Sequence, residues 1–305
     1  MENAEDKKAP PTNVAQALTV AESELTASRI FFGHGTDNAW DEAVQLVLAA
    51  LGLPADSNDS VLSAAVSAPA WERLQAMLHR RIEERVPLPY LTGVAWFAGL
   101  SFTCDERAII PRSPLAEVIL NNFKPWYSGP EPTRLLDLCC GGGCIGLAAA
   151  HYHHGLTVDL VDLDPQALAL AGENIARHSL QQRVRALHSN LFSEVGQARY
   201  DLILSNPPYV DASDLAGMPA EYHHEPALAL ASGADGLDIT RRILAQALDY
   251  LTPGGLLLVE VGNSWEALED AYPQLPFTWL DFEQGGHGVF ALSAQDLQDY
   301  HARLS

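Results

Sequence analysis

The 305-residue sequence lacks any long apolar run, and its first residues lack the pattern of a secretory signal. Purely apolar runs, such as residues 256–259, are far shorter than the ~20 residues that a helix needs to span a bilayer. The opening Met-Glu-Asn-Ala-Glu-Asp has neither a basic segment nor an apolar core. We therefore expect no association with a membrane, and we expect a cytoplasmic location.

Cysteine is scarce, and where it occurs it is crowded. The chain contains Cys104, Cys139, Cys140 and Cys144. Three of them lie within a six-residue stretch, which is poor geometry for a disulfide framework. The same spacing lacks the paired C-x-x-C modules typical of structural zinc sites. The sequence therefore predicts a reduced protein without a bound metal.

Positive charge is also scarce, since 18 Lys and Arg residues stand against 39 Asp and Glu residues, a net charge of -21. A protein that binds duplex DNA neutralises phosphates with clustered Lys and Arg, and no such cluster is present. We therefore expect no direct nucleic-acid binding and no attraction to anionic membranes. A basic protein partner is compatible with this charge, and so is an acidic protein that has no charged partner.

The length corresponds to about two domains at ~150 residues each. Residues 1–13 are polar and contain two adjacent prolines, which predicts a mobile tail. Residues 14–86 have helical periodicity, and Asn38 followed by Asp41 is typical of a helix start. We interpret residues 14–86 as an N-terminal helical domain. Its two expected apolar stripes consist of Trp40, Val44, Val47 and Leu51, and of Leu74, Met77, Leu78 and Ile82.

The periodicity changes after Pro87. Residues 90–97 and 100–104 predict the two strands of a β-hairpin connector within residues 87–112. Short apolar strands then alternate with amphipathic helices through residues 113–305, which predicts an α/β domain with a doubly wound, mostly parallel sheet. The expected strands are 134–138, 157–162, 184–188, 201–205, 256–261, 277–282 and 288–292, the last two forming an antiparallel pair. The expected helices are 113–123, 144–152, 165–178, 238–251 and 264–271.

A loop of small residues follows the strand that ends at Leu138. It contains Cys139, Cys140, Gly141, Gly142 and Gly143, and a helix is expected to begin after it. Glycines at such a point let the backbone approach a ligand and expose its N–H groups. The spacing is neither that of a dinucleotide loop nor that of a P-loop. The acidic residue at the end of the strand, Asp137, favours a cationic cofactor over a pyrophosphate; an ordinary strand–turn–helix is the alternative.

Two further strand ends supply candidate cofactor-binding residues. Asp162 lies 19 positions after Gly143, where an acidic residue of a Rossmann-like unit accepts hydrogen bonds from ribose hydroxyls. Asn190 and Leu191 follow the third strand, where an adenine ring would lie, and an ordinary polar turn explains them equally well. We interpret Asp164-Pro165 as a helix cap rather than as a binding element.

The most informative motif is Asn206-Pro207-Pro208-Tyr209, directly after the fourth strand. Two prolines fix the backbone and remove N–H donors, which leaves carbonyl acceptors beside the Asn206 amide oxygen. Such an array suits a substrate NH₂ group, because Asn206 and Pro207 can each accept one N–H while Tyr209 packs against the planar group. A proline-rich turn alone explains the prolines but not the asparagine and tyrosine.

Together these motifs resemble class I S-adenosylmethionine-dependent methyltransferases that modify planar amino groups. The resemblance implies a Rossmann-like seven-stranded, mostly parallel sheet and S-adenosyl-L-methionine as cofactor, bound by the loop residues, Asp137, Asp162, Asn190, Leu191 and Asn206. Asn206, Pro207 and Tyr209 would be catalytic, and Pro208 would complete the substrate-binding motif. Adenine-N6 nucleic-acid methylases and protein glutamine-N5 methylases share this motif.

Segments outside the motif resemble the glutamine enzymes, in particular the bacterial branch that acts on large-subunit ribosomal protein L-three. These segments are residues 34–42, 90–92, 109–114, 211–226 and 232–237. The resemblance implies that the partner is free ribosomal protein L-three, before or during ribosome assembly, and that the helical domain recognises it. Release factors are the alternative protein substrate, and adenine in nucleic acid is a more distant one. This chain departs from the family at Asn190 and His223, where the family usually has Asp and Arg. It also has Cys139 where the family usually has Gly, although the L-three branch tends to carry Cys there as well.

Two other features have a possible role near the substrate. Arg112 is interpreted either as a substrate or domain-junction residue or as part of a surface ion pair. The stretch 210–236 has little regular pattern, and long loops inside compact domains are usually functional. We interpret it as a loop that faces the substrate.

Overall fold

The computed structural model describes residues 10–304, and they form two compact units. Unit 1 contains the chain up to Gly93 together with the segment Pro219–His224, and unit 2 contains Val94–Met218 and the chain from Glu225 onward. Most of the expected tail, residues 1–9, lies outside the described residues. Its last residue belongs to the fold, because the Asn13 side chain accepts a hydrogen bond from the Gln16 N–H at the start of a helix.

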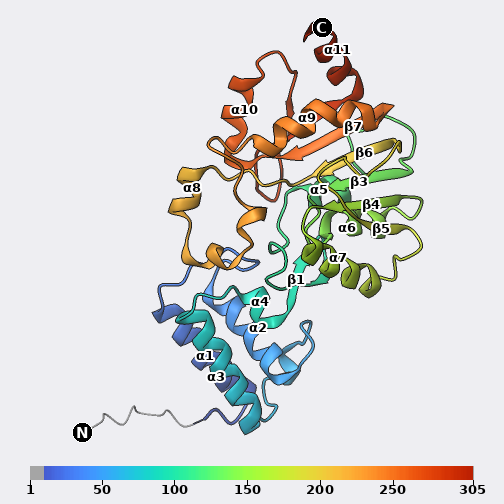
Figure 1. The fold of residues 1–305 in the computed structure, drawn as a ribbon. Helices are drawn as coiled ribbons and strands as arrows, with labels where there is room; N and C mark the ends of the chain where they lie inside the picture. The colour runs from blue at the N-terminus through green and yellow to red at the C-terminus, as the bar shows by residue number, and fades with distance from the viewer. Residues whose placement is uncertain (1–9, 305) are drawn as a thin grey trace. The chain divides into compact units, whose positions relative to one another are not determined.

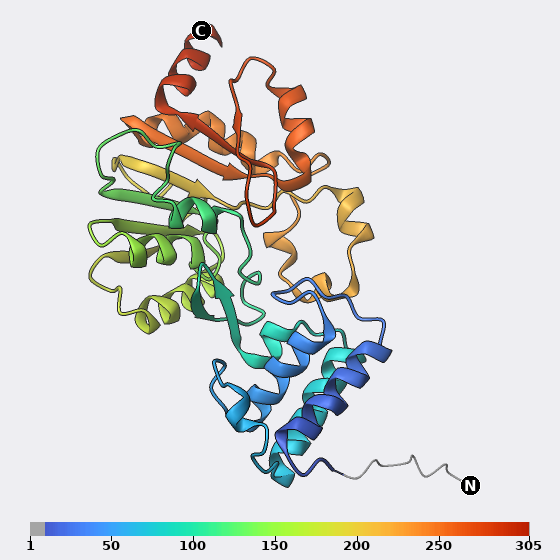
Figure 2. The same ribbon diagram turned by 180° about the vertical axis from the view of Figure 1, so that it is seen from behind.

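Unit 1 is helical, as the sequence predicts. Two of its long helices, α1 and α3, lie side by side in Figures 1 and 2. Asn38 caps α2 by accepting from the Asp41 N–H, and Gly52 ends that helix in a left-handed conformation. The helices are α1 (Val14–Ala27), α2 (Ala39–Leu51), η1 (Asp59–Val61), α3 (Ala68–Ile82), α4 (Leu88–Thr92) and η2 (Ala220–His224).

Most of the apolar stripe expected on α2 is confirmed. Val47 is fully buried, and Val44 and Leu51 pack against the core of unit 1, whereas Trp40 is 47% exposed. Glu42 is also buried on this helix, because its carboxylate pairs with Arg81, a partner distant in the chain that no local pattern indicates.

Two further predictions for connecting segments were wrong. Residues 90–92 form the end of helix α4 rather than part of a strand, because Pro89 is compatible with the first turn of a helix. The stretch 210–236, expected to have little regular structure, contains α8 (Ala212–Gly217), η2 and η3 (Ala227–Ala229). The Asp211 carboxylate caps α8 by accepting from the Ser213 and Asp214 N–H groups.

Unit 2 contains a two-stranded hairpin and a seven-stranded sheet. The sheet has the strand order β5-β4-β3-β6-β7-β9-β8, and its first five members run parallel (Figure 1). β9 is antiparallel to β7 and β8, which confirms the expected antiparallel pair. The strands are β1 (Val94–Phe97), β2 (Leu100–Thr103), β3 (Arg134–Leu138), β4 (Thr157–Asp162), β5 (Val184–His188), β6 (Tyr200–Ser205), β7 (Leu251–Glu260), β8 (Thr278–Trp279) and β9 (Val289–Ser293).

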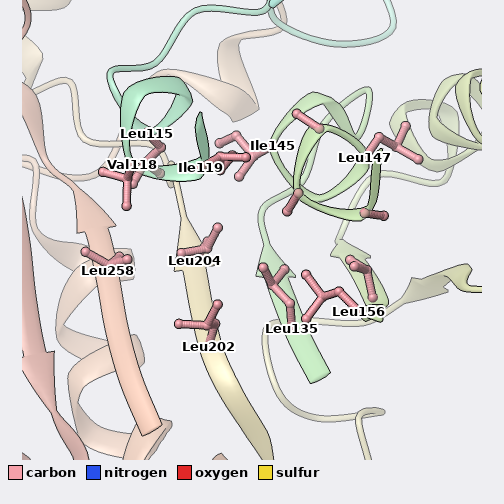
Figure 3. Packing of buried hydrophobic residues seen from close by; sticks show 14 of the residues in the cluster. Leu115, Val118, Ile119, Leu135, Ile145, Leu147, Leu156, Leu202, Leu204 and Leu258 are labelled. Carbon is pink, nitrogen blue, oxygen red and sulfur yellow. The ribbon is translucent and has the colours of Figure 1, made fainter. Parts of the chain in front are cut away.

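Helices cover both faces of this sheet, so successive strand residues enter different cores. In β6, Leu202 and Leu204 face one core and Ile203 faces the other. Figure 3 shows the first of these cores, in which leucines of β3, β6 and β7 pack beneath α5 and α6. The helices of unit 2 besides α8 and η3 are α5 (Leu115–Leu120), α6 (Cys144–Tyr152), α7 (Pro165–Arg177), α9 (Asp238–Tyr250), η4 (Gly262–Ser264), α10 (Trp265–Ala271) and α11 (Ala294–Leu304).

Element ends account for most remaining differences. The helix expected over 113–123 is shorter, because Pro114 precedes its first turn and residues 122 and 123 adopt positive φ angles. The strand expected over 277–282 is reduced to Thr278–Trp279 at the sheet edge. Helix α11 was not predicted at all, although Ser293 and Asp296 form reciprocal capping bonds at its start. Within residues 10–304, no helix is both long enough and apolar enough to cross a bilayer.

Candidate cofactor and acceptor site

The candidate site lies at the carboxyl ends of β3 and β6, the neighbouring strands at which the strand order changes direction. From β3 the chain first adds β4 and β5 on one side and then returns to place β6 on the other side of β3. In open α/β sheets, ligands bind outside the carboxyl ends of the strands at this switch point. Leu138 and Ser205, the last residues of β3 and β6, are paired, and the Ser205 hydroxyl donates to the Leu138 carbonyl at 2.8 Å. The glycine loop and Asn206 therefore begin next to each other.

The loop after β3 needs backbone conformations that favour glycine. Gly141 and Gly143 have φ angles of 53° and 83°, and Gly143 caps helix α6. Cys139 also adopts a left-handed conformation, with φ of 57°. A non-glycine residue there is strained by roughly 1–2 kcal/mol. This conformation is one that glycine adopts without strain.

Asp162 joins this loop to the end of β4. Its carboxylate accepts from the Gly141 N–H at 2.8 Å and from the Asp164 N–H at 2.9 Å. Burial raises the pKa of this carboxyl above its usual range. Each carboxylate oxygen retains a second lone pair, so Asp162 can still accept from a ligand hydroxyl. Asp164 caps α7 by accepting from the Gln166 N–H, as the sequence predicts.

A cleft at these strand ends contains about 770 Å³ of space free of protein atoms, including space open to solvent. Seven of the predicted site residues line it, namely Cys139, Gly141, Asp162, Asn190, Leu191, Asn206 and Pro208. The other walls come from segments that the sequence analysis did not assign to the site, including Arg107, Leu163, Leu228, Ile239 and Arg242.

Asn190 has a partner that the sequence did not indicate. Its amide oxygen accepts a hydrogen bond of 2.6 Å from the Arg242 guanidinium on α9. The expected acceptor for an adenine amine is therefore already engaged by one donor, although its second lone pair remains. Leu191 is buried beside it with a φ of 54° and forms part of the cleft wall.

Asp137 lies behind the loop rather than on the cleft surface. One carboxylate oxygen accepts from the Gly146 N–H in α6 at 2.8 Å, and the other has no hydrogen-bond partner among residues 10–304. Burial raises the pKa of this carboxyl to about 7. The observed contact of Asp137 therefore connects β3 to α6. Cys140, Gly142 and Gly143 likewise do not line the cleft.

Asn206 lines the cleft, and one hydrogen bond sets the orientation of its carboxamide. Its amide nitrogen donates to the Arg112 carbonyl at 3.3 Å, so its amide oxygen is presented as an acceptor. Pro207 follows it as a buried residue without an N–H. The predicted pair of acceptors, the Asn206 amide oxygen and the Pro207 carbonyl, therefore comes from adjacent residues at the end of β6.

Tyr209 is fixed by groups at the end of β7. Its hydroxyl donates to the Glu260 carboxylate at 2.9 Å, and the Ser113 hydroxyl donates to the same carboxylate at 2.6 Å. Its ring lies against Gly262, where an added Cβ would be 2.6 Å from the ring. Burial raises the pKa of Glu260, and the two hydroxyl hydrogen bonds act in the opposite direction. Glu260 was not identified from the sequence, because it appears there as a single acidic residue within an apolar strand.

A second cavity lies on the Tyr209 side of the motif. It contains about 720 Å³ of free space, including open solvent, and is lined by Arg112, Ser113, Tyr209 and Glu260 among others. Asn206 and Pro208 line the first cleft, whereas Tyr209 lines the second. The four-residue motif therefore contributes to the walls of both cavities.

The four cysteines are free thiols, and burial raises the pKa of each of them. For Cys104 the value is about 12. A thiol with a raised pKa is a poor nucleophile and a poor metal ligand at neutral pH. The part of the chain that the structure describes contains no group of three or more His, Cys, Asp or Glu residues arranged to hold a metal.

The open sheet, the glycine loop and the acidic end of β4 define a methyltransferase of the Rossmann-like class. The methyltransferase small domain model matches residues 116–221. The catalytic domain of hMettl16, in a crystal structure with the MAT2A 3′UTR hairpin 1, is similar in fold. The TM-score is 0.50 at 16% sequence identity, and the match covers 96% of this chain and 94% of that one.

Relatives with higher identity define the family. The ribosomal protein uL3 glutamine methyltransferase of Francisella tularensis is 47% identical over 279 residues, which are 91% of this chain and 89% of that protein. The enzyme of the same name from Neisseria gonorrhoeae is 45% identical over 287 residues, covering 94% of this chain and 96% of that protein. The chain belongs to the family of ribosomal protein uL3 glutamine methyltransferases. Its cofactor is S-adenosylmethionine.

Proposed function

We propose that this protein transfers a methyl group from S-adenosylmethionine to the side-chain amide nitrogen (N5) of a glutamine in free ribosomal protein uL3, in the cytoplasm. The observation that carries the proposal is the Asn206 carboxamide, whose nitrogen donates to the Arg112 carbonyl and whose oxygen is thereby left as an acceptor. Asn206 lines the first cleft, and Tyr209 of the same motif lines the second cavity. The names of the two relatives support ribosomal protein uL3 as the substrate.

The first cleft fits the cofactor by its own geometry. Its glycine loop brings main chain close to the space, and Asp162 offers carboxylate lone pairs at one wall. Leu163, Leu191 and Leu228 offer an apolar surface for a ring. S-adenosylmethionine supplies a methyl group that is already activated on a sulfonium. The protein therefore does not need a metal or a covalent intermediate for this transfer.

The amide nitrogen of glutamine is a weak nucleophile, because its lone pair is delocalised into the carbonyl. The role of the protein is therefore to bind and orient this group. The Asn206 oxygen and the Pro207 carbonyl accept its two N–H groups, and the Tyr209 ring packs against its plane. Positioning of this kind contributes ~7–11 kcal/mol to catalysis. As positive charge grows on the N–H groups, the same two acceptors stabilise it, as an oxyanion hole does for negative charge.

The Tyr209 cavity is the side from which we propose that the target glutamine enters. Its walls combine the Ser113 hydroxyl, the Glu260 carboxyl and the Arg112 side chain, which suit polar main-chain groups of a peptide. Unit 1 would recognise the rest of the protein substrate, and no direct contact with nucleic acid is needed for this reaction.

The experiment that tests the proposal offers radiolabelled S-adenosylmethionine and the enzyme to purified uL3, to a release factor and to DNA in parallel. We expect label in uL3, at a glutamine identified by mass spectrometry. Label in the release factor alone would show that the proposed reaction is correct but that its substrate is a release factor. Label in DNA alone, or in none of the three, would overturn the proposal.

A further inference from the structure

The orientation of Asn206 depends on the neighbouring segment 110–112, and this segment is in turn bound by Glu225. The Arg112 carbonyl accepts from the Asn206 amide nitrogen, as described above. The Arg112 side chain turns to Glu225, where Nη1 lies 2.7 Å from one carboxylate oxygen and 3.0 Å from the other. The Ile110 N–H donates to the same carboxylate at 3.4 Å. Glu225 therefore contacts residues 110 and 112 together.

Because the Glu225 carboxylate is buried, its stability depends strongly on the Arg112 guanidinium. Glu225 is only 4% exposed, whereas about a third of the Arg112 side chain is exposed. A buried carboxylate that loses its cation is strongly destabilised, so Glu225 holds the guanidinium and the attached main chain in place. Glu225 lies 19 residues beyond Asn206 in the chain and directly before Pro226, which lines the first cleft.

Orientation matters because a carboxamide has two chemically opposite ends. With its nitrogen bound to the Arg112 carbonyl, Asn206 offers an acceptor to the N–H groups of a substrate amide. If Asn206 rotated by half a turn about its terminal bond, it would place an NH₂ group against the substrate NH₂ group, and both would be donors. The position of the Arg112 carbonyl therefore decides whether the site accepts an amide nitrogen.

We propose that Glu225 is a positioning residue for methyl transfer, which acts through Arg112 to hold the Asn206 carboxamide in its accepting orientation. The inference rests on the proposed function, since it assigns Asn206 the role of the acceptor. It adds Glu225 to the site and gives Arg112 a role that does not require contact with the reacting atoms. Glu225 lies in the segment 211–226 that resembles the glutamine enzymes, but no helical or strand periodicity there indicates its role.

The test is a double-mutant cycle on the methylation of purified uL3, with single variants E225Q, R112Q and N206A. We expect E225Q to lower kcat by roughly 10–100-fold, by analogy with the loss of a residue that orients a metal ligand. Calorimetry of E225Q with S-adenosylmethionine should give a Kd within about twofold of the wild-type value, because neither Glu225 nor Arg112 is expected to contact the cofactor. E225D, which keeps the charge, should recover part of the loss in kcat.

The cycle separates positioning from a general structural role. If Glu225 acts through Arg112 and Asn206, the E225Q/R112Q double variant should be about as slow as the slower single variant, and E225Q should add little in the N206A background. Multiplicative losses in either background would overturn the inference, as would normal turnover of E225Q. Absence of transfer by the wild-type enzyme would instead contradict the proposed function.

The control is D159N, which removes another Arg-paired, buried carboxylate of unit 2. Asp159 is 6% exposed, contacts Arg185 and Tyr200, and lies within β4 away from the candidate site. It should lose stability with little change in kcat at temperatures where it remains folded. If E225Q is not folded, R112K, which keeps a cation for Glu225, takes its place in the N206A background. Multiplicative losses there would overturn the inference equally.

Discussion

At the scale of single residues, the candidate site depends on side chains whose freedom has been removed by their neighbours. Asn206 is oriented by a main-chain carbonyl, and Tyr209 by a buried carboxyl and by the surface of Gly262. A site that works by alignment needs such constraints, because a displacement of about 1 Å can reduce the rate by ~100-fold. The chemistry of the donor itself requires little from the protein.

Replacement of Asn206 by alanine should lower kcat by roughly 10²–10³-fold, by analogy with the loss of one oxyanion-hole donor. The reason is that one of the two acceptors for the target amide disappears, while the cleft keeps its other walls. Methylation of uL3 under saturating cofactor measures the effect. Turnover close to that of the wild-type enzyme would remove Asn206 from the mechanism.

Asp137 should make the stability of the protein depend on pH. Its pKa is about 7 in the folded protein, above the ordinary value of the carboxyl, which applies in the unfolded chain. The folded state therefore holds its proton more tightly, and this contribution to stability is greatest at low pH and is lost as the pH rises toward 7. The D137N variant cannot titrate at this position, so it should lose less stability than the wild type between pH 4 and pH 7.

The measurement is the free energy of unfolding in urea across that pH range, without cofactor. The difference between the two proteins should change by up to an amount on the order of 4 kcal/mol. Two curves that run parallel over the whole range would show that Asp137 keeps an ordinary pKa.

At the scale of secondary-structure elements, β3, its loop and α6 function as one unit because they pack without space between them. Gly146 in the first turns of α6 lies against β4, where an added Cβ would be 2.4 Å from a Leu160 methyl carbon and 3.0 Å from a Val158 methyl carbon. Both neighbours are buried strand residues, so they have little room to move. The close approach fixes the start of α6, and with it the loop before it, whose Cys139 and Gly141 line the cleft.

The G146A variant should therefore be destabilised by ~1–3 kcal/mol, the usual cost of overpacking. Its affinity for S-adenosylmethionine should fall as the loop is displaced. The matched control is G172A in helix α7, where an added Cβ meets nothing within 4 Å. That variant should gain ~0.5–1 kcal/mol from better helix propensity. Urea unfolding and calorimetry distinguish them, and equal behaviour of the two variants would contradict the packing argument.

At the scale of the whole molecule, the chain crosses between its two units more than once. After Met218 it enters unit 1 for the segment Pro219–His224 and then returns to unit 2 at Glu225. Within unit 1 this segment is held by Glu221, whose carboxylate accepts from the Phe31 N–H at 2.9 Å and from Arg81 at 3.2 Å. Arg81, Glu42 and Glu221 are each only 1% exposed.

Removal of the buried cation should be costly, because R81M leaves two buried carboxylates without it. We expect unit 1 to lose ~3–5 kcal/mol of stability, as for other broken buried ion pairs. Arg80, its neighbour in the helix, is half exposed and forms only a 3.6 Å pair with Glu84. R80M should therefore change the stability by less than ~1 kcal/mol.

Circular dichroism during chemical denaturation measures both variants, since unit 1 is predominantly helical. In limited proteolysis we also expect faster cleavage of R81M around residues 219–224, because the anchor of this segment is lost. Similar stability for R81M and R80M would mean that the buried network does not hold unit 1 together.

Sequence patterns were sufficient for the elements in which local preference and burial agree. The parallel strands, the helices after them, the caps at Asn38 and Asp164 and the antiparallel edge pair all have short-range signals in period, caps and glycines. The predicted site residues follow from the same logic, since the ends of neighbouring parallel strands meet at one edge. Most of them line the cleft, while their roles in binding and catalysis stay predictions.

Tertiary structure decided what depends on partners distant in the chain. Glu42, Arg81, Glu221, Glu225 and Glu260 look like solvated charges in the sequence, yet all are buried because each meets an oppositely charged or hydroxyl partner far away in the chain. Local periodicity therefore gave Trp40 a place on the buried stripe of α2 and described residues 210–236 as irregular. The sequence by itself determined the chemistry that the strand ends carry, because that chemistry depends on residue type and local backbone. Only the folded chain decided which charged residues hold the site residues in position. A buried charge needs an oppositely charged partner, and no local sequence pattern identifies a partner that is distant in the chain.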